Sequence, residues 1–284
     1  MNTLTPSVEL TRPPEDVARP ASHAGTWANI FAIAGVVLKE MYRRKDFYVL
    51  FVFIALITLV MGSVNIFNED KIVRYLKEIC LFLIWGASLV AAITMTARQI
   101  PFERENRTLY PLLAKPVTRN HLLIGKFLGC WYASGIGLLV FYTFFGIVAG
   151  AKDHQWPLVA YIQAVALHWL MLGVVCSMTL LGSLIFAAPS STNTIILVLT
   201  TGILLLGRHL NKVALKLAEP TQSIVYGIYF AIPHLEFFDV RDLLVHSWPP
   251  IAWTVLAGAL LYAIAYASFF LTAACLLFRR RSIN

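Results

Sequence analysis

The chain has 284 residues, of which 58% are hydrophobic and 13% are charged, and its net charge is +8. Soluble domains carry about 25% charged residues, so this composition argues strongly against a soluble globular enzyme. Most Lys and Arg residues lie in short segments between long apolar runs, which indicates membrane topology and not nucleic-acid binding. The four Cys residues lie in apolar runs without ligand-like spacing, so we predict no metal site.

The N-terminal part of the chain divides into a tail and a helix. Residues 1–25 are polar and contain four prolines, so we expect a disordered cytoplasmic tail. In residues 26–45, apolar side chains recur at helical spacing and the end is strongly basic. We interpret this segment as an amphipathic elbow helix in the interface of the inner leaflet. The alternative is that it extends the first span.

Six apolar runs follow, each long enough to cross about 30 Å of hydrocarbon. They lie near 46–65, 79–98, 122–150, 156–187, 190–207 and 248–278. The predicted fold class is therefore an all-α integral membrane protein, with a six-span domain over residues 46–284. With the N-terminus inside, the inner segments hold 15 Lys and Arg residues and the outer segments hold 8. This bias predicts that both termini lie in the cytoplasm.

The interiors of the spans contain almost no charged residues, which argues against an ion-coupled transporter. Gln163 and His168 are the polar exceptions, and for His168 we favour an interhelical hydrogen bond over proton transport. Gly125-Lys126 is followed by Phe127, so the phosphate-binding P-loop is absent. We find no catalytic constellation either. Any energy source for transport is therefore expected outside this chain.

The longest predicted inner loop, residues 99–121, carries apolar residues at helical spacing. Leu109, Leu112 and Leu113 fall at i, i+3 and i+4. Glu103 and Glu105 precede this predicted helix and favour its N-terminal end. Such an apolar face in water needs a partner surface. The alternative is an ordinary basic inner loop. After it, we expect Thr118 to cap the next helix.

The same loop resembles the signature of the ABC type-2 transporter permeases. The family's acidic pair, Thr-Leu, Leu-Leu, Pro-Val-Ser/Thr-Arg and Gly-Lys elements are matched by Glu103-Arg104-Glu105, Thr108-Leu109, Leu112-Leu113, Pro116-Val117-Thr118-Arg119 and Gly125-Lys126. The elbow helix and the six spans also match the family, so the resemblance covers residues from about 26 to 284. Asn106-Arg107 departs from the pattern, because family members usually carry a glycine before the threonine.

The resemblance implies a coupling helix around residues 103–116 that docks into a separate ABC ATPase subunit. The implied docking residues are Glu103, Glu105, Leu109, Leu112 and Leu113, with Arg104 and Arg107 forming ion pairs to the ATPase. Arg119 and Lys126 are expected to anchor the loop at lipid headgroups. ATP and magnesium would bind the partner ATPase, and this chain would hold no cofactor. A second permease chain is also implied, in a homodimer or a heterodimer.

Residues 208–247 form the largest predicted outer segment. Residues 208–219 have the pattern of an amphipathic surface helix. The segment fits an outer gate, a docking site for an extracytoplasmic partner, or a structural cap. It also holds five residues of metal-ligand type whose spacing is not specific for a metal: His234, Glu236, Asp239, Asp242 and His246. Aromatic residues in the spans either line an amphipathic path or pack and face lipid: Tyr132, Tyr142, Trp169, Tyr262 and Tyr266.

Together these features predict the permease subunit of an ABC exporter in the cell membrane of a prokaryote. Hydrolysis of ATP by a separate nucleotide-binding subunit would drive movement of a substrate across the membrane. One alternative is the membrane component of an ATPase-driven assembly or maturation system, which acts on an extracytoplasmic protein without substrate passage. A small membrane enzyme or an ATPase-independent channel is a further alternative.

Overall fold

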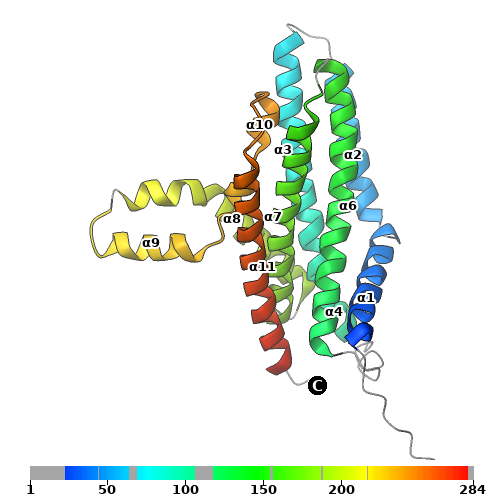
Figure 1. The fold of residues 1–284 in the computed structure, drawn as a ribbon, viewed down its shortest axis with the longest axis vertical. Helices are drawn as coiled ribbons and strands as arrows, with labels where there is room; N and C mark the ends of the chain where they lie inside the picture. The colour runs from blue at the N-terminus through cyan, green and yellow to red at the C-terminus, as the bar shows by residue number, and fades with distance from the viewer. Residues whose placement is uncertain are drawn as a thin grey trace, which may run out of the picture.

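The structure is a computed structural model that describes residues 23–43, 45–63, 69–105, 118–153, 156–186, 188–215 and 217–280. These residues form helices with short connections, and none of them lies in a strand. Besides α1 (His23–Arg43), the long helices are α2 (Lys45–Ser63), α3 (Glu69–Ala97), α6 (Arg119–Asp153), α7 (Leu158–Ile185), α8 (Pro189–Ala214) and α11 (Trp253–Arg280). Most of them run side by side in one elongated bundle (Figure 1).

In the described part of the chain, five helical stretches are long and apolar enough to cross a membrane. They are Arg74–Glu103, Arg119–Ala151, Leu158–Ile185, Pro189–Gly207 and Trp253–Arg280. These stretches match five of the six expected spans. The remaining expected span coincides with α2, whose described apolar stretch, Phe51–Val60, is shorter than the others. A sixth crossing therefore stays a prediction.

Helix α7 lies at the centre of the bundle and α11 lies at its edge. In the most apolar stretch of α7, 72% of the residues are buried, whereas in that of α11 only 11% are buried. α7 contacts α3, α6, α8 and α11. On α11, Leu261 and Phe269 expose about two thirds of their surface. Such an apolar face is solvated by lipid chains in a bilayer, so exposure there is compatible with a spanning helix.

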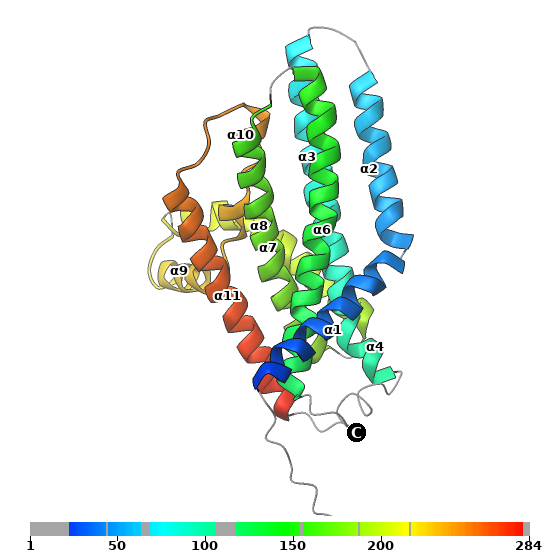
Figure 2. The same cartoon turned by 45° about the vertical axis from the view of Figure 1, so that its right-hand side comes forward.

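Helix α1 (His23–Arg43) packs obliquely across one end of α6 (Figure 2). Two glycines of α6, one turn apart, allow this close approach. A Cβ atom added at Gly129 would lie 2.7 Å from the Cβ of Val37, and one at Gly125 would lie 2.9 Å from that of Ile33. The expected elbow helix thus exists as a helix, and it begins three residues before the predicted 26. Its place in the membrane interface stays a prediction. Residues 1–22 of the expected tail lie outside the described residues.

The segment between α8 and α11 differs from expectation. Residues 208–214 continue α8 and are not part of a separate surface helix. They are followed by α9 (Thr221–Ala231), the 3-10 helix η1 (Leu235–Phe238) and α10 (Arg241–Val245). α9 lies to the side of the bundle, whereas α10 packs on α3 and α7 (Figure 1). The last helix begins at Trp253 and not at 248, because Trp248 and Pro249 each precede a proline, and a residue before a proline is disfavoured from the helical conformation.

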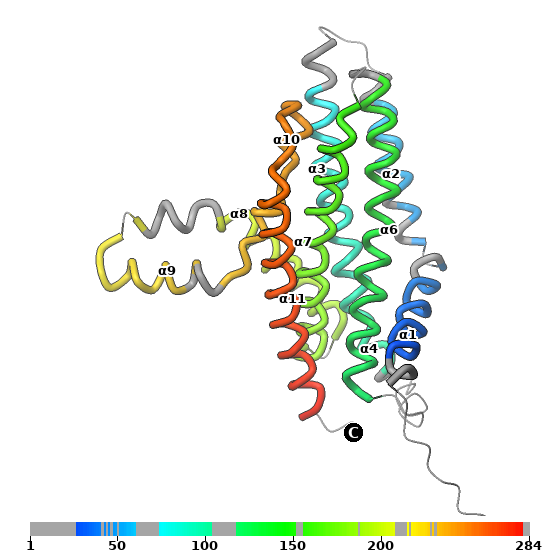
Figure 3. Tube along the Cα trace, in the orientation of Figure 1, coloured from blue at the N-terminus to red at the C-terminus, as the bar shows by residue number. Residues whose placement is uncertain are grey.

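Helix α1 and the final turns of α11 lie at the same end of the bundle (Figure 3). α4 (Gln99–Glu105) and the first turn of α6 lie at this end too. We call it the α4 end. Arg119 of α6 donates a hydrogen bond of 3.2 Å to the carbonyl oxygen of Phe278, near the C-terminus of α11. A cation at this position also interacts favourably with the helix dipole.

The chain before α11 is fastened to α7 by Gln163. The Gln163 amide nitrogen donates to the carbonyl oxygen of Ile251 over 2.8 Å, and the Ile251 N–H donates to the Gln163 amide oxygen over 2.9 Å. Both polar groups of one backbone residue are therefore satisfied by a single buried side chain. The polar character of Gln163 is explained by this structural bond.

Replacing Gln163 with leucine is expected to lower the free energy of unfolding by about 1–3 kcal/mol, because the Ile251 N–H and C=O groups lose their partner. Thermal unfolding of the purified chain in detergent measures this change. Gln222→Leu on α9 is the control, and it should shift stability by less than about 0.5 kcal/mol. Equal effects of the two substitutions would show that the Gln163 bonds do not stabilise the fold.

Candidate functional site

A buried polar network joins α1, α4 and α6 at the α4 end. The Lys126 ammonium of α6 lies 2.6 Å from a carboxylate oxygen of Glu103, on α4. It also donates a hydrogen bond of 3.0 Å to the amide oxygen of Gln99. The Gln99 amide nitrogen in turn donates to the Glu40 carboxylate of α1 over 3.3 Å. Each of the three helices thus contributes at least one charged or amide side chain.

Local helix geometry places these side chains together. Gln99 and Glu103 are four residues apart, so they share one face of α4. Pro101 lies in the first turn of α4, where its missing N–H leaves no bond unmade. Lys126 immediately follows Gly125, one of the two glycines at which α1 packs against α6, and Glu40 lies one turn beyond Val37 on α1. The glycine contact therefore positions Lys126 and Glu40, two charged residues of the network.

The network is shielded from solvent. The side chains of Lys126 and Glu103 expose only 7% and 9% of their surface, and Gln99 as a whole exposes 3%. Buried charges are tolerated only when they are paired and hydrogen-bonded. The ion pair therefore links α4 to α6, in addition to the contacts of α4 with α3 and α7, because any large displacement of α4 would leave a charge buried without its partner.

The network also holds the chain that leads into the predicted coupling segment. Residues 106–117 lie outside the described residues, and so do the predicted docking residues Arg107, Leu109, Leu112 and Leu113. The chain enters this segment from α4, which Glu103 ties to α6. It leaves the segment at Thr118, whose hydroxyl accepts a bond of 3.4 Å from the His121 N–H, which confirms the predicted cap.

The structure places Glu103 and Lys126 differently from expectation. We expected Glu103 and Glu105 at the start of a helix over 103–116, but they are the last residues of α4. The Glu103 carboxylate points into the bundle. We expected Lys126 at the headgroups, but its ammonium is buried because Glu103 and Gln99 supply partners there. The side chains of Arg104 and Glu105 lie outside the described residues.

Sequence analysis also missed two members of the network, Glu40 and Gln99. Gln99 and Glu103 at i, i+4 were the available signal, together with a lysine at the start of an apolar run.

Arg119, the second predicted headgroup anchor, is half-buried and contacts the last turns of α11: its guanidinium carbon lies 5.9 Å from the centre of the Phe278 ring.

A second polar cluster lies in the middle of the bundle. The Nε2 atom of His168 lies 2.9 Å from the Ser88 hydroxyl of α3, and its Nδ1 atom lies 3.3 Å from the Tyr142 hydroxyl of α6. His168 itself belongs to α7 and is buried. The predicted interhelical hydrogen bond of His168 is therefore confirmed. The cluster links the three central helices.

Two side-chain pairs lie in the segment before α11. His234 Nδ1 lies 3.3 Å from a Glu236 carboxylate oxygen, and the Tyr262 hydroxyl accepts a bond of 2.8 Å from the His234 N–H. The Glu236 carboxylate lies against Gly207, where a Cβ atom would be 2.5 Å from its oxygen. These contacts support a structural role. No group of three or more metal-ligating side chains occurs among the described residues.

Arg241 forms the second pair, with both carboxylate oxygens of Asp239, at 2.8 and 2.9 Å. Its guanidinium carbon lies 4.8 Å from the centre of the Trp85 ring. Burial lowers the pKa of Arg241, but the hydrogen bonds and charge of Asp239 outweigh this effect and leave the pKa above its ordinary value. Arg241 therefore remains a cation that holds α10 against α3.

The family comparison agrees with this architecture. The sequence pattern of the family described as ABC-2 family transporter protein matches residues 26–282, which is most of the chain. No individual curated protein matches the chain. The matched residues include α1, every long helix and the network at the α4 end. The chain therefore belongs to the ABC-2 transporter family and is a multi-pass membrane component of an ABC transporter.

Proposed function

We propose that this chain is the permease subunit of an ABC exporter that is driven by a separate ATPase. The carrying observation is the buried Glu103–Lys126 pair, which ties the chain entering residues 106–117 to the core of the bundle. Force on this segment would reach α6 through the pair and α1 through Gln99 and Glu40. A rigid connection of this kind is what mechanical coupling requires.

In this proposal, Leu109, Leu112 and Leu113 dock into a cleft of the ATPase together with Glu105, and Arg104 and Arg107 form ion pairs with the ATPase. Glu103 acts inside the bundle, as the residue that transmits the movement. The α4 end faces the cytoplasm, six spans cross the cell membrane of a prokaryote, and a second permease chain completes the transporter. ATP and magnesium bind the ATPase. Closure of two ATPase subunits brings two coupling helices together and drives the substrate outward.

Purification of the chain from its native membrane tests this proposal directly. A soluble P-loop ATPase is expected in stoichiometric amount, and it should be lost when Leu109 and Leu113 are both replaced with aspartate, because charges in an apolar docking face oppose burial. The control replaces Leu215 and Ile224, two exposed residues between α8 and α10, with aspartate. The control should retain the ATPase. Retention of the ATPase by the first variant would contradict the docking assignment.

A maturation or assembly role is the second candidate, and exposed apolar residues favour it. Leu215, Ile224, Phe237 and Trp248 each expose more than half of their surface in the segment between α8 and α11. A protein partner on the extracytoplasmic side would cover such residues. In that case the Leu215 and Ile224 variant should lose an extracytoplasmic protein while it keeps the ATPase. Transport of substrate by the same variant into vesicles would argue for the exporter.

A further inference from the structure

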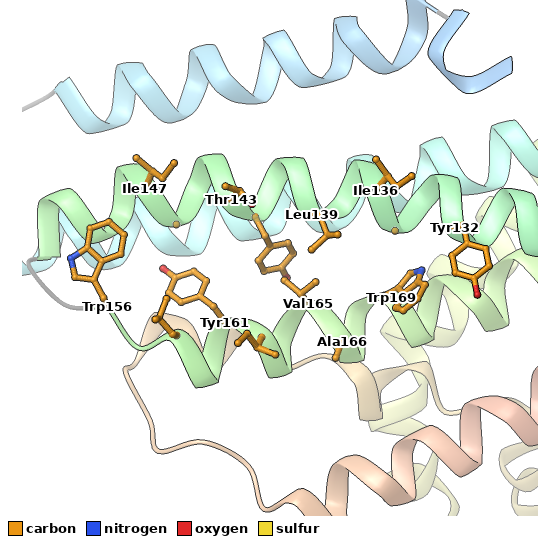
Figure 4. Close-up of a pocket in the computed structure, with 15 residues that line it drawn as sticks. Tyr132, Ile136, Leu139, Thr143, Ile147, Trp156, Tyr161, Val165, Ala166 and Trp169 are labelled. Carbon is orange, nitrogen blue, oxygen red and sulfur yellow. The ribbon is translucent and has the colours of Figure 1, made fainter. Parts of the chain in front are cut away.

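An apolar groove lies between α6 and α7, in the half of the bundle away from the α4 end (Figure 4). Its volume is about 600 Å³, within the range of about 300–1,000 Å³ that is typical of small-molecule sites. Along α6 the groove extends from Tyr132 to Ile147, and Trp156 stands at its far end. Three of the aromatic residues singled out in the sequence line it: Tyr132, Tyr142 and Trp169.

Glycines of α6 make room for the aromatic walls of this groove. A Cβ atom at Gly135 would lie 2.5 Å from the indole nitrogen of Trp169, and one at Gly150 would lie 2.8 Å from the ring of Trp156. Only glycine leaves space for these rings at such a distance from the helix backbone. The rings of Trp156 and Trp169 thus pack directly against the backbone of α6.

Reciprocal hydrogen bonds fix the inner end of the groove. The indole N–H of Trp131 donates to the carbonyl oxygen of Trp169 over 2.9 Å, and the indole N–H of Trp169 donates to the carbonyl oxygen of Trp131 over 3.0 Å. The two rings are stacked with their centres 4.7 Å apart. Because both polar N–H groups are used within the protein, the Trp169 ring presents only carbon to the groove. The inner end of the groove is therefore preformed.

The dimensions of the groove limit its occupant. Tyr132 and Ile147 are 15 residues apart, which corresponds to about 22 Å along a helix. The volume spread over this length leaves a channel too narrow for a helix with its side chains, which needs about 10–12 Å. One leaflet of the hydrocarbon core is about 15 Å thick, so a single hydrocarbon chain of one leaflet is shorter than the groove and narrow enough to lie along it.

The geometry points to a binding site for one acyl chain of a membrane phospholipid. Leu139, Ile147 and Ile162 line the groove and are still partly exposed, so its open side faces the lipid phase. Trp156 exposes 58% of its surface at the end where the headgroup would lie, and indoles favour the headgroup layer. This inference does not depend on the ATPase or on the direction of transport.

An occupied groove would contact the polar cluster at the centre of the bundle. The Tyr142 ring forms part of the wall, and its hydroxyl is the partner of His168. His168 also holds Ser88 of α3. A bound acyl chain therefore packs on the side chain that connects α6 to α7 and α3, and it stabilises the arrangement of these three helices.

Photolabelling with a lipid probe tests the inference. The full chain is reconstituted in phosphatidylcholine vesicles that contain a trace of phosphatidylcholine with a diazirine on one acyl chain, and labelled peptides are quantified by mass spectrometry. We expect residues 132–147 and 158–169 to be labelled more strongly than the face of α11 that carries Leu261 and Phe269. Those two residues are at least as exposed as any residue that lines the groove, so labelling by simple exposure would not favour the groove.

A groove-filling variant adds a matched comparison. Ala166 lines the groove, whereas Ala265 is exposed on α11 outside it. Ala166→Trp should reduce groove labelling about tenfold, because the indole occupies the space of several chain methylenes. Ala265→Trp should leave it unchanged. Labelling that follows exposure in the unsubstituted chain would overturn the inference even if Ala166→Trp fails to fold. Crosslinks from the groove to a second copy of this chain would also overturn it.

Discussion

Replacement of Lys126 with methionine is expected to lower the free energy of unfolding by about 3–5 kcal/mol, the effect of leaving one charge of a buried pair without its partner. Glu103 would keep its burial and lose the ammonium that lies 2.6 Å from its carboxylate. The amide oxygen of Gln99 would lose a donor as well. Chemical or thermal unfolding in detergent measures the loss. We expect the same variant to lose ATP-dependent transport, because α4 would no longer be held to α6.

Two further variants distinguish the effect of breaking the ion pair from the effect of removing a single charge. Lys39→Met removes an exposed cation from α1 at the same end of the bundle and should change stability by less than about 0.5 kcal/mol. Replacing both partners, as Glu103→Leu with Lys126→Met, should restore most of the stability, since apolar residues of similar volume often substitute well for a buried pair. If Lys126→Met lowered the free energy of unfolding no more than Lys39→Met, the network would not hold α4 in place.

Alanine at Gly129 is expected to displace α1 from α6 and to lower the free energy of unfolding by about 1–3 kcal/mol, as overpacked contacts do. The added Cβ atom would lie 2.7 Å from the Cβ of Val37 and 3.0 Å from the carbonyl oxygen of Ala34. Neither atom belongs to the flexible end of a side chain, so the helix itself must move. The displacement should also speed cleavage by trypsin after Arg43, at the exposed end of α1.

Gly86 on α3 provides the matched control for this substitution. A Cβ atom at Gly86 meets nothing within 4 Å, so Gly86→Ala should leave stability unchanged or raise it slightly through the better helix propensity of alanine. The two variants make the same chemical change in two apolar helices and differ only in the neighbouring helix. Equal stability and equal trypsin cleavage would show that α1 does not depend on close contact with α6.

The Lys126→Met and Gly129→Ala substitutions are both expected to affect coupling to the ATPase. Lys126 directly follows Gly125, so the glycine contact with α1 and the ion pair with α4 occupy one turn of α6. A displacement of α1 would move Glu40 away from Gln99, and a displacement of α4 would separate Glu103 from Lys126. We therefore expect each substitution to weaken the response of the bundle to its ATPase, even where the chain stays folded.

The sequence by itself was sufficient to predict the long helices, because an apolar run of about 20 residues is a local property. α6, α7 and the first part of α8 lie where their apolar runs lie. Errors arose at the ends of elements. The start of α11 moved to Trp253 because of two prolines, and α8 continued to Ala214 where a separate surface helix was expected. His168 was also interpreted correctly, since a lone histidine in an apolar span needs a partner.

Only the tertiary structure decided which polar residues meet. Glu103 has the sequence context of a solvent-facing acid in a charged loop, yet it is buried against Lys126, which is 23 residues away and on another helix. The aromatic residues of α6 and α7 likewise form a groove only because glycines of the facing helix admit their rings. Contacts of this kind depend on how separate helices pack in space. A local pattern records the composition of each helix face, but it does not record which face lies opposite.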